Sequence, residues 1–74
     1  MRIQVKLIGQ FSLKCGFTEK DVELPDASTV ADALKKLGLK DLPYVASIGG
    51  HGVKDEAPLK DGERLVVSPV FSGG

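Results

Sequence analysis

The sequence predicts one α+β domain in which a single main helix packs on one face of a mixed β-sheet. Apolar and polar residues alternate near both ends of the chain, as they do in half-buried strands. One segment between these ends has apolar residues at helical spacing. The length of 74 residues allows only one domain, which we expect to span residues 1–70 and to be followed by a flexible tail, residues 71–74.

The first two strands are expected within residues 1–9 and 19–25. Ile3, Val5 and Leu7 fall on one face of the first segment. The second segment alternates in the same way, and the two lie close in sequence, so an antiparallel hairpin is the simplest interpretation.

The connection between these strands, residues 10–18, is expected to be a turn region because Gly9 and Gly16 interrupt the pattern. Its apolar side chains are expected to add to the core; they are Phe11, Leu13 and Phe17.

N-cap candidates for the main helix lie in Asp26-Ala27-Ser28-Thr29, and Thr29 with Asp32 three residues later fits a capping pattern. Gly38 has the position of a C-terminal cap. Four apolar residues repeat at helical spacing between the caps: Val30, Ala33, Leu34 and Leu37.

The second half of the chain is predicted to form strands at residues 44–48 and 64–70, with a short return strand that begins near Val53. Gly49-Gly50-His51-Gly52 is expected to form the first turn, and Asp61-Gly62 lies in the second.

Composition excludes several classes of function. Ten basic and ten acidic residues cancel, so no basic surface for nucleic acid is expected. No apolar run approaches the length of a membrane span, and the first residues enter a strand pattern without a signal-peptide core, so we expect a cytoplasmic protein. Cys15 and His51 are the only residues of their kinds, so neither an internal disulfide nor a structural zinc site is expected.

The end of the sequence, Gly73-Gly74, carries the functional prediction. Two glycines add no packing, but without Cβ atoms they can enter a narrow channel in another protein. The carboxylate of Gly74 must be activated before a nucleophile can attack it, for example as an acyl-adenylate. The sequence has no Gly-x-x-x-x-Gly-Lys-Ser/Thr motif for nucleotide binding, so we expect a partner enzyme to activate Gly74.

These motifs resemble those of the ubiquitin-like β-grasp sulfur carriers, most closely the small subunit of molybdopterin synthase. The resemblance spans the chain and is most specific in the Asp61-Gly62-Glu63 turn, the strand after it, and the ending Pro69-Val70-Phe71-Ser72-Gly73-Gly74. Two departures are a single proline, Pro69, where two are common, and Phe71 before Ser72. The resemblance implies that the first and last strands are parallel neighbours at the centre of the sheet.

The resemblance also implies a reaction cycle and its partners. An adenylating enzyme of the ubiquitin-activating kind uses ATP and magnesium to adenylate Gly74. Sulfur from a persulfide donor then displaces AMP and leaves a thiocarboxylate, which the tail carries into the large subunit of molybdopterin synthase to form molybdopterin. In this cycle the chain is a non-catalytic carrier and binds no cofactor or metal of its own.

Partner-binding residues are predicted in the tail and in the last strand; they are Gly73, Ser72, Phe71, Val70 and Val66. Alternation places Leu65 and Val67 inward and leaves Val66 outward, although a core position for Val66 is equally compatible with the pattern.

Three alternatives remain open at this stage. The chain could carry sulfur for thiamine synthesis or for tRNA thiolation. It could be a protein modifier whose Gly74 forms isopeptide bonds with lysines. It could also be a β-grasp binding module that does not use its Gly-Gly end.

Overall fold

The computed structural model describes residues 1–40 and 42–70. In chain order, these residues form β1 (Arg2–Leu7), α1 (Gln10–Cys15), β2 (Glu19–Glu23), α2 (Val30–Leu37), β3 (Tyr44–Ile48), β4 (His51–Val53) and β5 (Arg64–Pro69). Across this part of the chain, no helix is long and apolar enough to cross a membrane.

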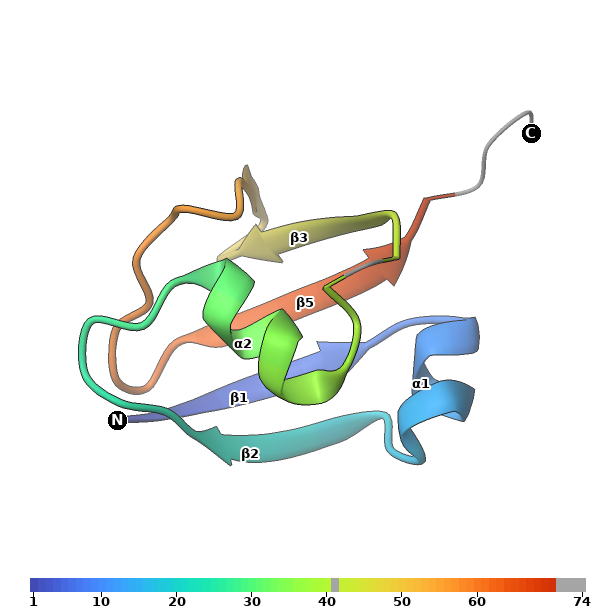
Figure 1. The fold of residues 1–74 in the computed structure, drawn as a ribbon, viewed down its shortest axis with the longest axis horizontal. Helices are drawn as coiled ribbons and strands as arrows, with labels where there is room; N and C mark the ends of the chain where they lie inside the picture. The colour runs from blue at the N-terminus through green and yellow to red at the C-terminus, as the bar shows by residue number, and fades with distance from the viewer. Residues whose placement is uncertain (41, 71–74) are drawn as a thin grey trace.

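The strands form one mixed sheet in the order β2-β1-β5-β3-β4. β1 and β5 are parallel, and the other neighbouring pairs are antiparallel. Figure 1 shows α2 crossing one face of this sheet. The predicted mixed sheet, its main helix and its central parallel pair are therefore confirmed.

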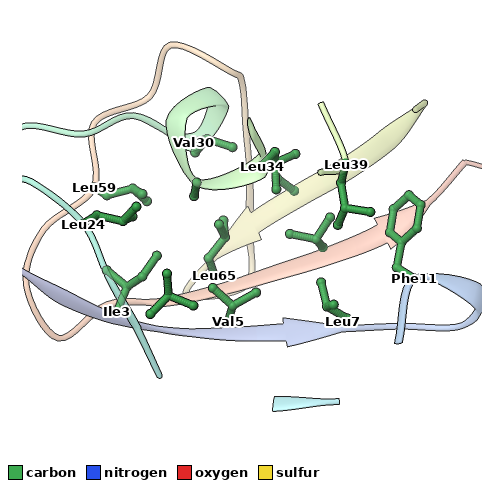
Figure 2. Packing of buried hydrophobic residues seen from close by; sticks show 14 residues of the cluster. Ile3, Val5, Leu7, Phe11, Leu24, Val30, Leu34, Leu39, Leu59 and Leu65 are labelled. Atoms are coloured by element: carbon green, nitrogen blue, oxygen red, sulfur yellow. The ribbon is translucent and has the colours of Figure 1, made fainter. Parts of the chain in front are cut away.

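The core lies between α2 and the sheet. Figure 2 shows side chains of β1 and β5 pointing towards those of α2. All of the labelled residues are buried, and they include Ile3, Val5, Leu7, Leu65, Val30 and Leu34. This core uses one face of the sheet, and α2 leaves the other face, called the open face, uncovered.

Local signals explain the ends of α2. The Thr29 side chain accepts a hydrogen bond from the Asp32 N–H, and the Asp32 carboxylate accepts one from the Thr29 N–H at 2.9 Å. Gly38 ends the helix with a φ of 78°, which favours glycine. The predicted helix and both of its caps are confirmed.

The prediction of a turn region at residues 10–18 was wrong, because residues Gln10–Cys15 form α1. The usual start signals are missing: Gly9 offers no side-chain cap, and the first turn has no acidic residue. So short a helix depends on tertiary packing. Phe11 supplies that packing from within the core, whereas Leu13, also predicted to contribute, is 85% exposed.

Several strand boundaries differ from the prediction. The turn after β3 consists of Gly49 and Gly50, both with positive φ, and His51 already belongs to β4. β1 and β2 each end two residues earlier than predicted, and β5 ends one residue earlier, at Pro69.

Removing the cap of α2 should measurably destabilise the protein. Thr29→Ala removes the side-chain acceptor for the Asp32 N–H, and we expect it to lower the free energy of unfolding by about 1 kcal/mol. Urea unfolding followed by circular dichroism measures the change. Thr18→Ala, at an exposed threonine outside the helices, is the control. Equal stability of the two variants would contradict the capping role.

Candidate functional site

The tail root, defined here as Pro69 and Val70, is the last described part of the chain before the Gly-Gly end. It consists of the last residue of β5 and the residue after it, and β5 lies between β1 and β3 in the sheet. The predicted site residues beyond it lie outside the described residues, so their roles stay predictions; they are Phe71, Ser72, Gly73 and Gly74.

Few backbone hydrogen bonds hold the tail root. The Ile8 N–H donates to the Val67 carbonyl at 3.0 Å, but Pro69 has no N–H with which to continue that ladder. On the other side, the Val70 N–H donates to the Pro43 carbonyl over a long 3.4 Å. The position of the tail root therefore depends mainly on how the Pro69 ring packs.

Pro69 is buried between a glycine and a tyrosine. Tyr44 is its cross-strand partner on β3. On the other side, a Cβ added to Gly9 would lie 3.6 Å from Cγ of Pro69. Gly9 has a φ of 62°, so a side chain there would also strain the backbone. Gly9 thus lets the chain after β1 pass close to the Pro69 ring.

An apolar patch, defined as Ile8, Val45, Val66 and Val70, lies beside the tail root. Ile8, Val45 and Val70 are 43%, 53% and 43% exposed, and Val66 is partly exposed. Strand register places Val45 opposite Ser68, and the Ile8 N–H reaches the Val67 carbonyl on the other side of β5. Exposed apolar groups gathered in this way typically mark an interaction surface.

The other half of the open face carries ion pairs. Arg2 pairs with Glu23 at 3.1 Å, and Arg64 pairs with Glu19 at 3.2 Å. Gln4 lies in the same half and donates to Glu19 at 3.3 Å. The open face therefore carries ion pairs at one end, and the apolar patch, with Lys6 beside Val66 and Ser68 opposite Val45, lies at the end next to the tail root.

Two members of the patch were predicted from the sequence and two were missed. Val66 and Val70 are exposed enough for the predicted partner contact, a role that stays a prediction. Ile8 and Val45 were not singled out. Ile8 follows Arg2, Gln4 and Lys6 on the outward side of β1. An apolar residue at an outward position of a strand is the signal that would have pointed to Ile8.

A polar network lies near the tail root, on the face of the sheet that α2 covers. The Tyr44 hydroxyl donates a hydrogen bond to Oδ1 of Asp55, and Lys40 Nζ lies 3.3 Å from Oδ2 of the same carboxylate. The Asp55 carbonyl accepts a hydrogen bond from the Ala31 N–H at 2.9 Å. The network thus joins the start of β3 to the loop after β4, to the first turn of α2 and to the segment that follows this helix.

The pKa values in this network show which groups are charged. Burial raises the pKa of Tyr44 to about 12, and the hydrogen bond to Asp55 adds to the rise. The hydroxyl therefore remains a donor at neutral pH. The same hydrogen bond holds the pKa of Asp55 below its usual value, and Lys40 acts in the same direction. Asp55 is thus ionised at neutral pH.

Across residues 1–40 and 42–70, no group of three or more histidine, cysteine or acidic side chains is placed to hold a metal ion. Cys15 is a partly buried thiol whose Sγ lies 3.7 Å from the Leu37 carbonyl.

The family of the chain follows from its sequence. The model of the ThiS family matches residues 5–74, which is nearly the whole length. The chain belongs to the ThiS family. The match includes the tail root and continues through Gly74.

Solved structures agree on the fold of this ThiS-family protein. The small archaeal modifier protein 1 of Haloferax volcanii is 18% identical, with a TM-score of 0.82, over 95% of this chain and 98% of that one. A candidate molybdopterin converting factor subunit 1 from Pyrococcus furiosus is 22% identical, with a TM-score of 0.83, over 96% and 99% of the two chains. A chain in the complex of subunits 1 and 2 of molybdopterin-converting factor from Helicobacter pylori is 21% identical, with a TM-score of 0.65, over the full length of both.

These likenesses confirm the predicted ubiquitin-like β-grasp fold and the predicted resemblance. The protein is thus a ThiS-family member with the ubiquitin-like β-grasp fold. The pathway that it serves is a separate question.

Acid should weaken the network through Asp55. Because folding lowers the pKa of this carboxyl, its contribution to stability is complete above its unfolded value of about 3.9 and is lost as the pH falls through the folded value. We therefore expect Asp55→Asn to lose less stability than the wild type when the pH is lowered below about 4.

Urea unfolding at a series of pH values measures this difference. Asp21→Asn, at an exposed carboxylate on β2, is the control and should follow the wild-type pH dependence more closely. An identical acid dependence for Asp55→Asn and the wild type would contradict the assignment.

Proposed function

We propose that the chain is a sulfur carrier whose Gly74 is adenylated by a partner enzyme, converted to a thiocarboxylate, and used to supply sulfur for molybdopterin synthesis. The observation that carries this proposal is the ThiS-family match, which continues through Gly74. The tail root adds support, because β5 ends beside an exposed apolar patch that a partner can cover.

The proposed cycle has three chemical steps at Gly74. A carboxylate oxygen of Gly74 attacks the α-phosphorus of ATP, and pyrophosphate leaves. The terminal sulfur of a donor persulfide then attacks the acyl carbon, and AMP leaves with the electrons of the broken C–O bond. A thiol finally attacks the donor sulfur of the resulting acyl disulfide, which releases the thiocarboxylate and leaves a disulfide. ATP, magnesium and the persulfide belong to the partners, and the chain itself is a carrier and not an enzyme.

The choice of molybdopterin as the receiving pathway depends on the ending Pro69-Val70-Phe71-Ser72-Gly73-Gly74. Two of the structures with this fold carry the name of molybdopterin converting factor, and one of them is a complex with subunit 2. By analogy, we assign this chain a large-subunit partner that would accept the tail. The thiamine and tRNA pathways share every step up to the thiocarboxylate.

Protein modification is the second candidate, because the Haloferax protein with this fold is named a modifier. The two candidates differ only in the nucleophile that meets the acyl-adenylate. A persulfide gives a thiocarboxylate, whereas the amine of a lysine gives an isopeptide bond.

Mass spectrometry of the intact protein tests the reaction at Gly74. After co-expression with the adenylating enzyme and sulfur donor of its source organism, we expect a mass shift equal to the exchange of one oxygen for sulfur, located at Gly74. A variant without Gly74 is the control and should show no shift. An unmodified wild type would contradict the carrier proposal, and covalent adducts to lysines would favour the modifier.

Charge in the apolar patch should weaken binding to these partners. We expect Val66→Lys to lower affinity for the adenylating enzyme about tenfold or more, because a partner that covers the patch would bury an unpaired ammonium. Gln4→Lys adds the same charge to the end of the same face that carries the ion pairs and is the matched control. Isothermal titration calorimetry gives both affinities, and equal losses would show that the patch is not the contact.

A further inference from the structure

The tail root has little backbone support, so the side chains around Pro69 must set the direction in which the tail leaves. Among the described residues, Pro69 supplies no N–H, and the bond from the Val70 N–H to the Pro43 carbonyl is 3.4 Å long. Gly9 flanks Pro69 without a side chain. Tyr44 is therefore the large neighbour that can restrain the ring across the strand pair.

Both side chains lie on the helix-facing side of the sheet. Pro69 is buried in the same register as Leu65 and Val67, and Tyr44 packs against the core in the register of Ala46. Directly opposed side chains on antiparallel strands have Cβ atoms about 5 Å apart, which is contact distance for two rings. Movement of the Tyr44 ring would therefore free space beside Pro69.

The Tyr44 ring is itself held at its far end. Its hydroxyl donates to Asp55, whose carboxylate also pairs with Lys40 and whose carbonyl is fixed by the Ala31 N–H. One hydroxyl thus couples the strand beside the tail root to the loop after β4 and to α2.

We propose that Tyr44 is a positioning residue for the reaction at Gly74: its hydrogen bond to Asp55 fixes the ring beside Pro69 and thereby directs the tail into the partner. The role of Tyr44 in the reaction rests on the proposed function, whereas its restraint of the Pro69 ring does not. Tyr44 touches neither Gly74 nor the reacting atoms, and it acts through Pro69.

The exposure of the Lys40 and Asp55 side chains indicates that the network stabilises its own surroundings more than the whole fold. The side chains of Lys40 and Asp55 are 42% and 43% exposed, and ion pairs with this exposure add little to global stability. A hydrogen bond that restrains one ring can still reduce the number of directions open to a nearby tail. Its loss should therefore affect the tail root and its binding step more than the folding equilibrium.

Amide hydrogen exchange tests the structural part without any partner. In Tyr44→Phe, which keeps the ring and removes only the hydroxyl, we expect exchange at the Val70 amide to accelerate about threefold to tenfold through local opening. Thr29→Ala, which acts at the cap of α2, is the control for general destabilisation and should not accelerate Val70 selectively. Unchanged exchange at Val70 in Tyr44→Phe, or the same change in both variants, would overturn the inference.

Adenylation kinetics test the functional part. With the adenylating enzyme, we expect Tyr44→Phe to raise the KM for the carrier about threefold to tenfold and to leave kcat nearly unchanged, because a less restrained tail costs more to order on binding. Asp55→Asn should have the same effect, and the double variant should be no worse than either single variant. An unchanged KM, or effects that add in the double variant, would overturn the positioning role.

The two measurements separate this inference from the proposed function. A wild-type chain that the enzyme does not adenylate would contradict the proposed function and, with it, the role of Tyr44 in the reaction. Exchange at Val70 would still decide whether Tyr44 holds the tail root.

Discussion

β5 lies between β1 and β3, and this placement determines where the tail root leaves the sheet. β5 is hydrogen-bonded in parallel to β1 and antiparallel to β3, and its inward residues Leu65 and Val67 are fully buried in the core. The chain that leads to Gly74 therefore starts from the middle of the sheet and not from a fraying edge. A tail attached there begins at a defined point of the sheet.

The two faces of the sheet have different roles in this small domain. The face under α2 packs against buried side chains of the helices and loops, as Figure 2 shows, and a domain of this length needs that packing because its stability margin is narrow. The open face is left for recognition, with its ion pairs at one end and the apolar patch beside the tail root at the other. Under the proposed function, the partners supply the reacting groups, and this chain supplies a positioned carboxylate with a surface by which to recognise it.

Patterns that are local in sequence predicted most of the fold. Thr29, Asp32 and Gly38 marked the ends of α2 because capping is a contact between near neighbours. α1 was missed because Gly9 provides no cap and the helix depends on Phe11 reaching a core made by distant segments. The candidate site was predicted only in part, because some of its contacts join residues that are distant in sequence. Val66 could be found by alternation along one strand, whereas the contact of Gly9 with Pro69 and the hydrogen bond between Tyr44 and Asp55 arise only when the chain folds.

The central claim is that the folded domain, and not the Gly-Gly end alone, makes Gly74 a substrate. The most direct test compares the whole chain with a synthetic peptide of residues 68–74 in ATP–pyrophosphate exchange catalysed by the adenylating enzyme. We expect rapid exchange with the whole chain and, at the same concentration, little or none with the peptide, which lacks most of β5 and most of the apolar patch. Equal exchange rates for the two would contradict it, because the enzyme would then recognise the tail without the domain that displays it.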